Sequence, residues 1–438
     1  MVIPNYVKFC LERLENAGFA TYTVGGCVRD ALLGLEPHDF DLCTSALPEE
    51  TEAVFSDCRL VLAGKKHGTV AVVTEGGIVE ITTFRTEGGY TDNRHPEWVK
   101  FVPDIEQDLA RRDFTVNAMA YSPTRGFADP FGGREDLKKH ILRAVGDPAT
   151  RFEEDSLRIL RGVRFAAKYR LAVEARTMDA MLNLRGMMNH LAKERVFDEL
   201  CKLILLINEQ DLARFAPILA AVIPELEPQI GFDQRSPHHA YDLYTHTAHV
   251  TANLPADLAL RWAGLLHDTG KISCFTTDQT GRGHFYGHAK ESAKIADSIL
   301  RRLKAPTALR EQVVQLVELH MTKIEPERKS VRRWLGRLGP ETMDALLTLQ
   351  KADMGSKGTG KPEEMEQFSR IRAVLEEIRA EDACLSLKDL AVNGHDLMDL
   401  GFSGKAIGKA LDALLNQVID EQLPNEKQAL LDAAAQLL

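Results

Sequence analysis

Two short runs near the N-terminus carry residue types that bind phosphates and metal ions. In the first, Tyr22-Thr-Val-Gly-Gly-Cys-Val-Arg-Asp-Ala-Leu-Leu-Gly, an apolar run ends at Val24 and apolar residues recur at helical spacing from Val28. Between them, Gly25 and Gly26 allow a tight turn and a close approach of the backbone to a ligand. A strand, a glycine turn and the start of a helix together present free N–H groups to a phosphate.

The second run, His38-Asp-Phe-Asp-Leu, follows after a short gap. Because alternate residues of a strand share a face, Asp39 and Asp41 would project together while Phe40 and Leu42 point into the core. Paired carboxylates of this kind form the two-metal clamp used in nucleotidyl transfer. A glycine pair alone is often only a turn, and alternating aspartates alone are often a solvated strand face. The order of the two runs and the short gap favour the catalytic interpretation.

The composition excludes several classes of protein. The 438 residues predict two to four domains, and a hydrophobic content of 44% suffices for their cores. The sequence has no run of about 18 apolar residues, so no membrane span is expected, and its start does not resemble a signal peptide. The seven cysteines are scattered, odd in number and without a C-x-x-C pair. This pattern indicates a reduced, cytoplasmic protein without a disulfide framework.

The charge balance bears on nucleic-acid binding. A net charge of −10 argues against a protein coated in nucleic acid. The same net charge is compatible with a protein that binds a short RNA segment through a local basic surface. Positive charge clusters at residues 158–170 and 329–337, which are the candidates for such a surface.

The residues around the two runs predict the elements that hold them. Residues 5–18 are typical of an amphipathic helix, and residues 59–85 of β-strands with a turn at Gly76 and Gly77. Glu80 lies inside the last of these strands, where a charged residue needs a reason. Either its face is exposed, or it is a third carboxylate near the metals. Residues 86–100 are polar and rich in turn formers, which predicts a mobile loop.

A third polar group occurs in Asp108-Leu-Ala-Arg-Arg-Asp-Phe-Thr-Val-Asn-Ala. Its Arg112, Asp113 and Asn117 would either reach a triphosphate and a ribose or form a surface ion-pair cluster. Together with the glycine and aspartate runs, the motif Arg111-Arg-Asp-Phe-Thr-x-Asn-Ala resembles the class II tRNA nucleotidyltransferase and poly(A) polymerase family.

The resemblance covers most of the chain and implies an α+β fold. A nucleotidyltransferase head similar to polymerase β, with a small mixed sheet, would span residues 1–128. All-helical parts would follow: a neck for base recognition and RNA binding (129–230), an HD metal-dependent phosphohydrolase-like domain (231–355) and a tail (356–438).

The resemblance also implies roles for particular residues. Those matching Asp39 and Asp41 hold Mg²⁺, and by analogy Glu80 is a third catalytic carboxylate. The nucleotide would be bound by Gly25, Gly26, Arg29, Arg112, Asp113 and Asn117.

Residues 152–167 predict a helix with an apolar face and a charged side. Asp155 and Arg158 are three residues apart and so adjacent on one side, and Arg161 and Arg164 continue the stripe. One interpretation is a solvated, salt-bridged helix. The family resemblance implies instead that Asp155 and Arg158 pair with the base edge, and that Arg161 and Arg164 face the triphosphate.

The hydrogen-bonding groups of the bases support a template made of one carboxylate and one guanidinium. Cytosine N4 and adenine N6 both donate to a carboxylate, and cytosine N3 and adenine N1 both accept from a guanidinium. Uracil and guanine present the opposite groups, which would leave buried polar atoms unpaired at a cost of several kcal/mol. Such a pair admits CTP and ATP and rejects UTP and GTP.

Residues 238–353 hold most of the histidines. An adjacent His and Asp at a helix end, with a distant His and a distant Asp, suit a divalent metal with mixed nitrogen and oxygen ligands. The pattern resembles the HD phosphohydrolase family and leaves the identity of the metal open. His288 and His320 are candidates for a second metal or for phosphate contacts. The H…HD…D ligands of that family match His246, His267, Asp268 and Asp353.

The C-terminal part predicts a linker at residues 356–362 and a charged helix at 364–380. Further on, Lys405 and Lys409 with the nearby glycine backbone would contact tRNA phosphates, or would be solvated lysines at the start of a helix.

Taken together, the resemblances imply template-independent addition of CCA to the 3′ end of tRNA from CTP and ATP, with an accessory HD phosphohydrolase activity. Three alternatives stay open: a poly(A) polymerase, a partial enzyme that adds only CC or only A, and a non-catalytic RNA-binding protein with HD activity alone. Lys65-Lys-His-Gly-Thr fits the tRNA branch better than the poly(A) branch, and the full length of residues 86–100 argues against a CC-only enzyme.

Overall fold

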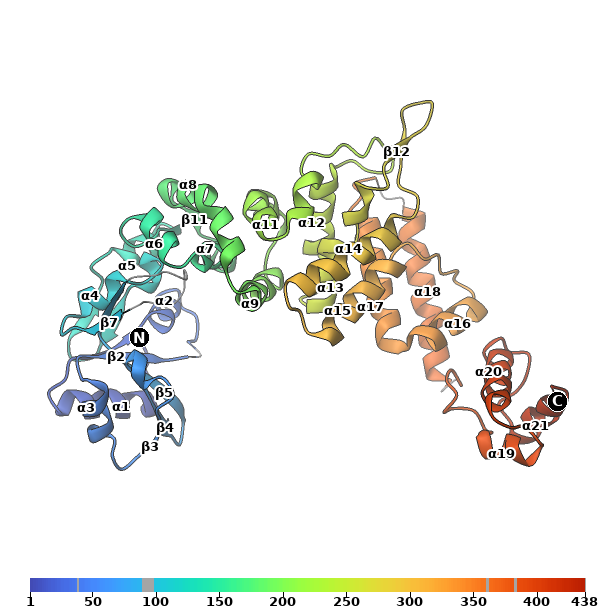
Figure 1. Cartoon of the computed structure of the whole chain (residues 1–438), viewed down its shortest axis with the longest axis horizontal. Coiled ribbons are helices and arrows are strands. Elements are labelled where there is room, and N and C mark those ends of the chain that lie inside the picture. The colour runs from blue at the N-terminus through green and yellow to red at the C-terminus, as the bar shows by residue number, and fades with distance from the viewer. Residues whose placement is uncertain (38, 89–97, 360–361, 382–383, 438) are drawn as a thin grey trace. The chain divides into compact units, whose positions relative to one another are not determined.

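The computed structural model describes residues 1–37, 39–88, 98–359, 362–381 and 384–437 (Figure 1). His38 of the second run and positions 89–97 of the expected loop therefore lie outside the described residues. Contacts within the chain divide it into two compact units. The first contains residues 1–207 and 214–224, and the second contains 208–213 and 225–438.

A seven-stranded mixed sheet forms the core of the first unit. Its strand order is β3-β4-β5-β2-β1-β8-β9, in which β2 and β5 run parallel and the other neighbours run antiparallel. This mixed sheet, joined to many helices, confirms the predicted α+β class. The strands are β1 (Thr21–Val24), β2 (Asp41–Thr44), β3 (Arg59–Val61), β4 (Thr69–Thr74), β5 (Gly77–Thr83), β8 (Ala120–Ser122) and β9 (Gly126–Ala128).

Short helices flank this sheet. The predicted amphipathic helix is α1 (Asn5–Asn16), which buries Val7, Leu11 and Leu14 at helical spacing. The remaining elements of the head are α2 (Gly26–Leu32), α3 (Pro48–Val54), α4 (Ile105–Ala110) and α5 (Gly133–Lys138), with the 3₁₀ turns η1 (Lys65–His67) and η2 (Thr115–Asn117).

The expectation of a loop over residues 86–100 is wrong at both ends. Residues 85–88 form β6 (Arg85–Gly88), which pairs antiparallel with β7 (Trp98–Phe101). Gly88 lies directly under the Trp98 ring, where a Cβ would come within 2.6 Å of the indole. Main-chain pairing and this ring contact favour a hairpin over the loop that the polar composition predicts.

Helices follow the sheet in the rest of the first unit. The predicted continuous helix through Asp155 is interrupted, because α6 (Pro148–Glu154) ends there and Asp155 adopts an extended conformation before α7 (Leu157–Tyr169) begins. Helices and 3₁₀ turns make up most of residues 175–229, as the family resemblance implies for the neck. These elements are α8 (Ala175–Leu184), η3 (Arg185–His190), α9 (Lys193–Ile204), α10 (Glu209–Arg214), α11 (Ala216–Val222) and η4 (Pro224–Gln229), and the short strands β10 (Ile141–Leu142) and β11 (Ala172–Val173) pair nearby.

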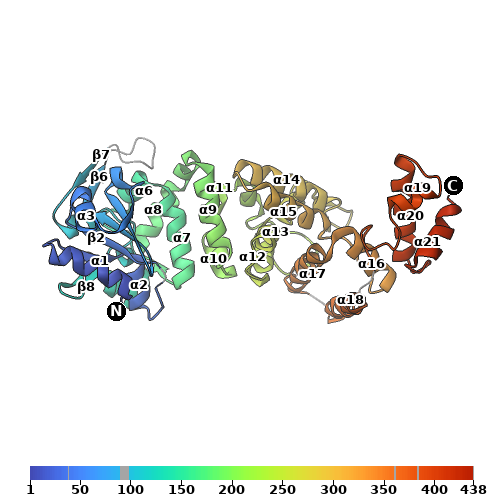
Figure 2. The same cartoon turned by 90° about the horizontal axis from the view of Figure 1, so that it is seen from below.

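The second unit is a helical bundle followed by a small C-terminal group of helices (Figure 2). Its central helices pack on one another in the pairs α12·α13, α14·α15, α13·α15 and α12·α17. The predicted charged helix is α18. The bounds are α12 (Leu243–Asn253), α13 (Leu258–Leu266), η5 (Thr269–Lys271), β12 (Thr276–Thr277), β13 (Gly283–His284), α14 (His288–Arg302), α15 (Thr307–Leu319), α16 (Arg328–Leu338), α17 (Pro340–Gly355) and α18 (Pro362–Ala380).

The C-terminal helices are α19 (Gly394–Asp399), α20 (Lys405–Ile419) and α21 (Lys427–Ala435), packed around Leu397, Leu414 and Leu430. The buried Arg332 of α16 donates to the carbonyl oxygens of Val418 and Ile419 at 3.1 and 2.9 Å, which satisfies the open end of α20.

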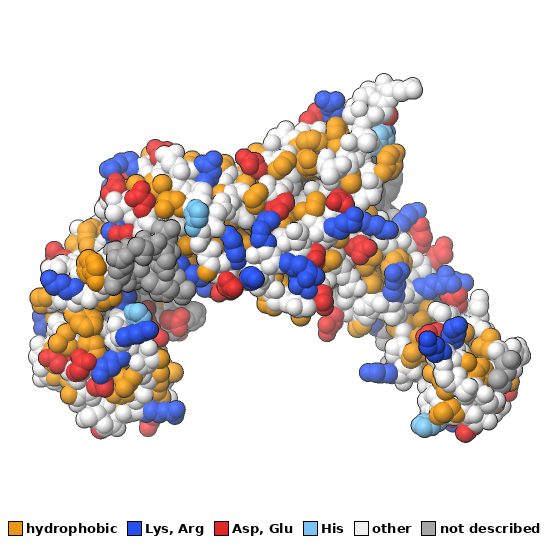
Figure 3. Space-filling model, viewed as in Figure 1, with side chains coloured by type: hydrophobic (Ala, Val, Ile, Leu, Met, Phe, Trp, Pro, Cys, Tyr) orange, Lys and Arg blue, Asp and Glu red, His pale blue; other side chains and the backbone are white. Residues whose placement is uncertain are grey.

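The basic cluster at residues 329–337 is partly neutralised in the structure. Lys329 and Arg333 both pair with Asp420, and Arg332 pairs with Glu421. On the face seen in Figure 3, lysine and arginine side chains are interspersed with acidic ones. These contacts hold the C-terminal helices, and a role of this segment as a basic RNA surface stays a prediction.

All seven cysteines are free thiols, and four of them are buried. Among the described residues, no helix combines the length and the apolar character that crossing a membrane requires.

Candidate active site and candidate metal centre

The glycine turn between β1 and α2 forms as predicted. Gly25 has a φ of +76°, a conformation that favours glycine, and its N–H donates to the carbonyl oxygen of Met119 at 3.0 Å. A Cβ at this position would lie 3.0 Å from a guanidinium nitrogen of Arg112. Glycine therefore allows both the turn and the close approach of Arg112.

Carboxylates gather beside this turn. Phe40 and Leu42 are buried, with exposed fractions of 7% and 0%, which confirms the alternation expected of them. The parallel register places Glu80 of β5 directly beside Asp41 of β2. Loss of surrounding water raises the pKa of Asp41, and the charges of Glu80 and Asp39 raise it further against the opposing effect of Arg112. Concentrated carboxylate oxygens of this kind fit a divalent cation.

One pocket of about 510 Å³ brings most of the predicted residues together. It also contains four residues that the sequence interpretation did not assign to the nucleotide: Arg111, Leu157, Phe165 and Arg195. Glu80 and Arg164 are not among its lining residues. The predicted residues that line it are Gly25, Gly26, Arg29, Asp39, Asp41, Arg112, Asp113, Asn117, Asp155, Arg158 and Arg161.

The arginine of the glycine run is held from several sides. Arg29 is 6% exposed and donates to the Asn117 side chain and, at 2.5 Å, to the Tyr169 hydroxyl. Its guanidinium lies 4.3 Å from the centre of the Tyr169 ring, a cation–π distance. These contacts fix one cationic side of the pocket before any ligand binds.

Asp113 links the head motif to α7. It accepts hydrogen bonds from Asn117 at 3.0 Å and from Arg161 at 2.7 Å. Burial alone would raise the pKa of Asp113, but the Arg161 guanidinium and the Asn117 amide outweigh it and lower the pKa to about 2. Arg161 lines the pocket while its charge is shared with this carboxylate.

Asp155 and Arg158 line the same pocket without pairing with each other. Asp155 accepts from Arg195 of α9 at 2.8 Å, whereas Arg158 donates to Glu154 at 2.7 Å and to the carbonyl oxygen of Arg111 at 3.1 Å. The adjacency on one helix face that their spacing predicts does not form, because the helix is interrupted at Asp155. Each side chain is instead anchored by a separate partner.

Arg164 lies elsewhere than the other predicted triphosphate contacts. Its guanidinium pairs with the buried Glu199 of α9, and it is not among the residues that line the pocket. Arg195 was not predicted, because it belongs to none of the motifs and reaches the pocket only through its contact with Asp155, 40 residues earlier in the chain. Among the described residues, one buried nitrogen each of Arg112 and Arg195 has no hydrogen-bond partner, so the pocket offers donors to an anionic or polar ligand.

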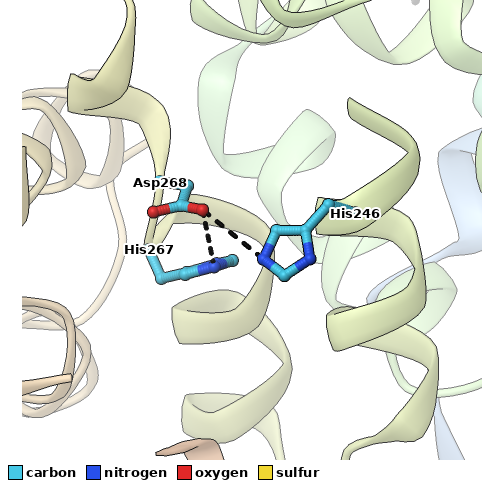
Figure 4. Close-up of side chains that lie close together, drawn as sticks. All are labelled: His246, His267 and Asp268. Carbon is cyan, nitrogen blue, oxygen red and sulfur yellow. Dashed lines mark ion pairs between the residues drawn. The ribbon is translucent and has the colours of Figure 1, made fainter. Parts of the chain in front are cut away.

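The second cluster predicted from the sequence also assembles. His246 of α12 and His267, at the end of α13, direct their Nε2 atoms at the same oxygen of Asp268, at 3.5 and 3.1 Å (Figure 4). Asp353 of α17 approaches His246 Nε2 at 3.0 Å. All four side chains are buried, with exposed fractions of 6% or less.

This cluster fits a metal ion. His267 Nδ1 donates to the carbonyl oxygen of Gly264 at 2.8 Å, which orients the ring so that Nε2 faces Asp268. Burial alone would raise the pKa of Asp268, but His267 and Lys271 hold it well below its usual range. Lys271, which sequence reasoning missed although it follows His-Asp-Thr-Gly directly, has its Nζ 2.8 Å from Asp268.

Comparison with known proteins connects these features. Residues 21–143 match the model of the poly A polymerase head domain, and residues 284–434 match the model described as tRNA nucleotidyltransferase domain 2, putative. A solved structure of the Bacillus stearothermophilus CCA-adding enzyme in complex with CTP superimposes with a TM-score of 0.71 at 27% identity, covering 100% of this chain and 98% of that one.

Curated relatives extend the match along the chain. The CCA-adding enzyme of Latilactobacillus sakei is 34% identical over 97% of this chain and 96% of its own length. That of Limosilactobacillus fermentum is 34% identical over 98% of this chain and 96% of its own length. Because this similarity includes the head motifs and continues through the neck and the helical remainder, the chain belongs to the CCA-adding enzyme family.

Proposed function

We propose that this protein adds CCA to the 3′ end of tRNA, taking CMP from CTP and AMP from ATP without a nucleic-acid template. The observation that carries the proposal is a single pocket in which Asp39 and Asp41 occur together with Asp155 and Arg158. The CTP complex of the Bacillus stearothermophilus relative supports a nucleotide as the ligand.

The carboxylates Asp39 and Asp41, assisted by Glu80, would hold Mg²⁺. When bound there, Mg²⁺ lowers the pKa of the attacking 3′-hydroxyl and neutralises charge on the leaving pyrophosphate. Arg29, Arg112 and the glycine turn would orient the triphosphate, for which their donors suit the anionic oxygens.

Base choice would come from Asp155 and Arg158. The carboxylate of Asp155 accepts from the amino group of cytosine or adenine, and the guanidinium of Arg158 donates to the neighbouring ring nitrogen. Arg195 would keep the Asp155 carboxylate in place while Glu154 does the same for Arg158. Selectivity then depends on two fixed side chains, since uracil and guanine leave both unpaired.

The experiment that tests the proposal is incubation of the purified protein with tRNA lacking its 3′ CCA and with each labelled nucleotide, alone and combined. Growth by CC with CTP alone and by CCA with CTP and ATP is expected. Long products with ATP alone would instead identify a poly(A) polymerase, and growth that stops at CC or requires a CC end would identify a partial enzyme.

The remaining parts of the assignment are also proposals. The functional division into head (1–128), neck (129–230), HD domain (231–355) and tail (356–438) follows the family resemblance. A cytoplasmic location is proposed from the scattered, unpaired cysteines. Lys405 and Lys409, both exposed near the start of α20, are proposed contacts for tRNA phosphates.

A second activity, metal-dependent phosphohydrolysis, is supported by His246, His267, Asp268 and Asp353. A buried cluster of two imidazoles and two carboxylates is costly to fold unless a cation compensates it. Hydrolysis of a chromogenic phosphate ester after addition of Mn²⁺, Co²⁺ or Ni²⁺ tests this activity. Hydrolysis that survives His267→Gln would assign it to another site.

A further inference from the structure

Tyr169 is the last residue of α7, and it contacts the nucleotide pocket from behind without being one of its lining residues. Its hydroxyl accepts a hydrogen bond from Nη2 of Arg29 at 2.5 Å, and the centre of its ring lies 4.3 Å from the same guanidinium. Arg29, in contrast, lines the pocket. The contact joins residues 140 positions apart in the chain. Tyr169 therefore reaches a ligand of the pocket through Arg29.

The guanidinium of Arg29 is held at each of its three nitrogens. Nε donates to the neighbouring Asp30 at 2.8 Å, Nη1 donates to the side chain of Asn117, and Nη2 donates to Tyr169. Asp30 and Asn117 belong to the motifs of the head, whereas Tyr169 comes from α7. A guanidinium carries five N–H groups in one rigid plane. Holding it at three corners therefore fixes the direction in which its remaining donors point.

Phe165 and Tyr169 form an aromatic pair against Arg29. They are four residues apart on α7 and so share one of its faces, with ring centres 6.2 Å apart and planes at 28°. Arg29 lies 5.3 Å from the centre of the Phe165 ring. The two aromatic residues are 5% and 8% exposed. They contact the cation where little water reaches it, which is where cation–π attraction is strongest.

Two further arginines approach the same aromatic pair. The guanidinium groups of Arg161 and Arg164 lie 5.2 and 4.4 Å from the centre of the Phe165 ring, and each is paired with a carboxylate. Positive charges gathered around one buried ring repel one another, so Arg29 needs a group that holds it in place. Because the Tyr169 hydroxyl is neutral, it orients Arg29 without removing the positive charge that attracts a triphosphate.

We infer that Tyr169 is a positioning residue for nucleotide addition, which holds Arg29 in the orientation that receives the triphosphate of CTP or ATP. The inference rests on the proposed function, which assigns Arg29 to the triphosphate. The base-selecting Arg158 lies in the first turn of the same helix. At 1.5 Å per residue, Arg158 and Tyr169 are about 16 Å apart along α7. The loss of the Tyr169 hydroxyl should therefore weaken the binding of phosphates and leave the choice of base unchanged.

The test compares the full-length parent with Tyr169→Phe, which keeps the ring and removes only the hydroxyl. Affinity for CTP is measured by calorimetry, and tripolyphosphate serves as a competitor that carries phosphates but no base. Both affinities should fall by the same factor, on the order of 10-fold, because a hydrogen bond to a charged group is lost. The KM for CTP should rise by that factor while kcat and the preference for CTP over UTP change little.

A double substitution separates an action through Arg29 from a general loosening of the fold. In an Arg29→Met chain, Tyr169→Phe should have no further effect on CTP affinity, because the group through which the hydroxyl acts is gone. The matched control is Tyr121→Phe in β8, whose ring packs 4.6 Å from that of Phe127. This control should bind CTP as the parent does, and circular dichroism verifies that every variant is folded.

Three results would overturn the inference while leaving the proposed function intact. The first is unchanged CTP affinity in Tyr169→Phe, and the second is an equal loss of affinity with and without Arg29→Met. The third is a reduced preference for CTP over UTP, which would mean that α7 itself is distorted. A parent chain that binds CTP but adds no nucleotide to tRNA would overturn the proposed function, whereas calorimetry would still decide whether Tyr169 acts through Arg29.

Discussion

The head pocket and the His-Asp cluster both gather carboxylates around a proposed site for metal ions, but they are built in opposite ways. In the pocket, Asp39 and Asp41 are exposed, and arginines surround them. In the cluster, the proposed ligand side chains are almost completely buried, and half of them are imidazoles. Oxygen ligands open to water suit a hard, exchangeable ion such as Mg²⁺ that arrives with a nucleotide, whereas buried imidazoles suit a transition metal that stays bound.

The difference in burial also separates the effects expected of mutations. A residue of the open pocket changes chemistry with little cost to folding. A residue of the buried cluster contributes to chemistry and to folding stability, because removing one member of a buried charged group leaves the others uncompensated.

The largest expected effect is the loss of nucleotide addition when a carboxylate of the head pocket is replaced. Asp41→Asn removes a negative ligand oxygen, so nucleotide addition should fall on the order of 10³-fold while phosphate-ester hydrolysis is unchanged. Addition is measured with labelled CTP on tRNA lacking CCA. Glu106→Gln, an exposed carboxylate in α4, is the control and should behave as the parent. Ordinary nucleotide turnover in Asp41→Asn would contradict the metal assignment.

The next prediction concerns a substitution in the His-Asp cluster. His267→Gln removes an imidazole at the buried site, so hydrolysis and retained Co²⁺ should both fall by at least about 100-fold in affinity or rate. CCA addition measured on the same preparation should stay at the parental rate. Loss of both activities together would mean that the two sites are not independent.

A smaller effect is expected on the selection of the base. Asp155→Asn keeps the size of the side chain but supplies an N–H that can pair with the O4 carbonyl of uracil. The preference for CTP over UTP should fall on the order of 10- to 100-fold, measured as the ratio of kcat/KM values. The matched control is Glu153→Gln, an exposed carboxylate of α6. Unchanged selectivity would remove Asp155 from the template.

The smallest effect concerns stability. The pKa of Asp113 is held at about 2 in the folded chain, below the ordinary value of about 3.9. Its ionised form therefore stabilises the fold above about pH 4, by on the order of 2 kcal/mol, and this contribution is lost as the pH falls toward 2.

Asp113→Asn should accordingly lower the urea midpoint of unfolding at pH 6, and the difference from the parent should shrink at pH 3. A difference that grows on acidification would have the wrong sign for a depressed pKa.

Local pattern predicted the elements and most of the pocket. The alternation of Asp39 to Leu42 identified the buried and the exposed residues, because side-chain direction along a strand depends only on the period of the backbone. Glycine at the turn and the apolar period of α1 were readable for the same reason. The hairpin of β6 and β7 could not be predicted from local pattern, because its formation depends on pairing between two strands and not on composition.

Other features were decided by tertiary contacts alone. The sequence by itself determined which residue types are present and which share a strand or a helix, and it was enough to assign the family. Only the folded chain could pair Asp155 with Arg195 and direct Arg164 to Glu199. These partners lie tens of residues apart, so their meeting depends on how the helices pack, and no local spacing encodes it.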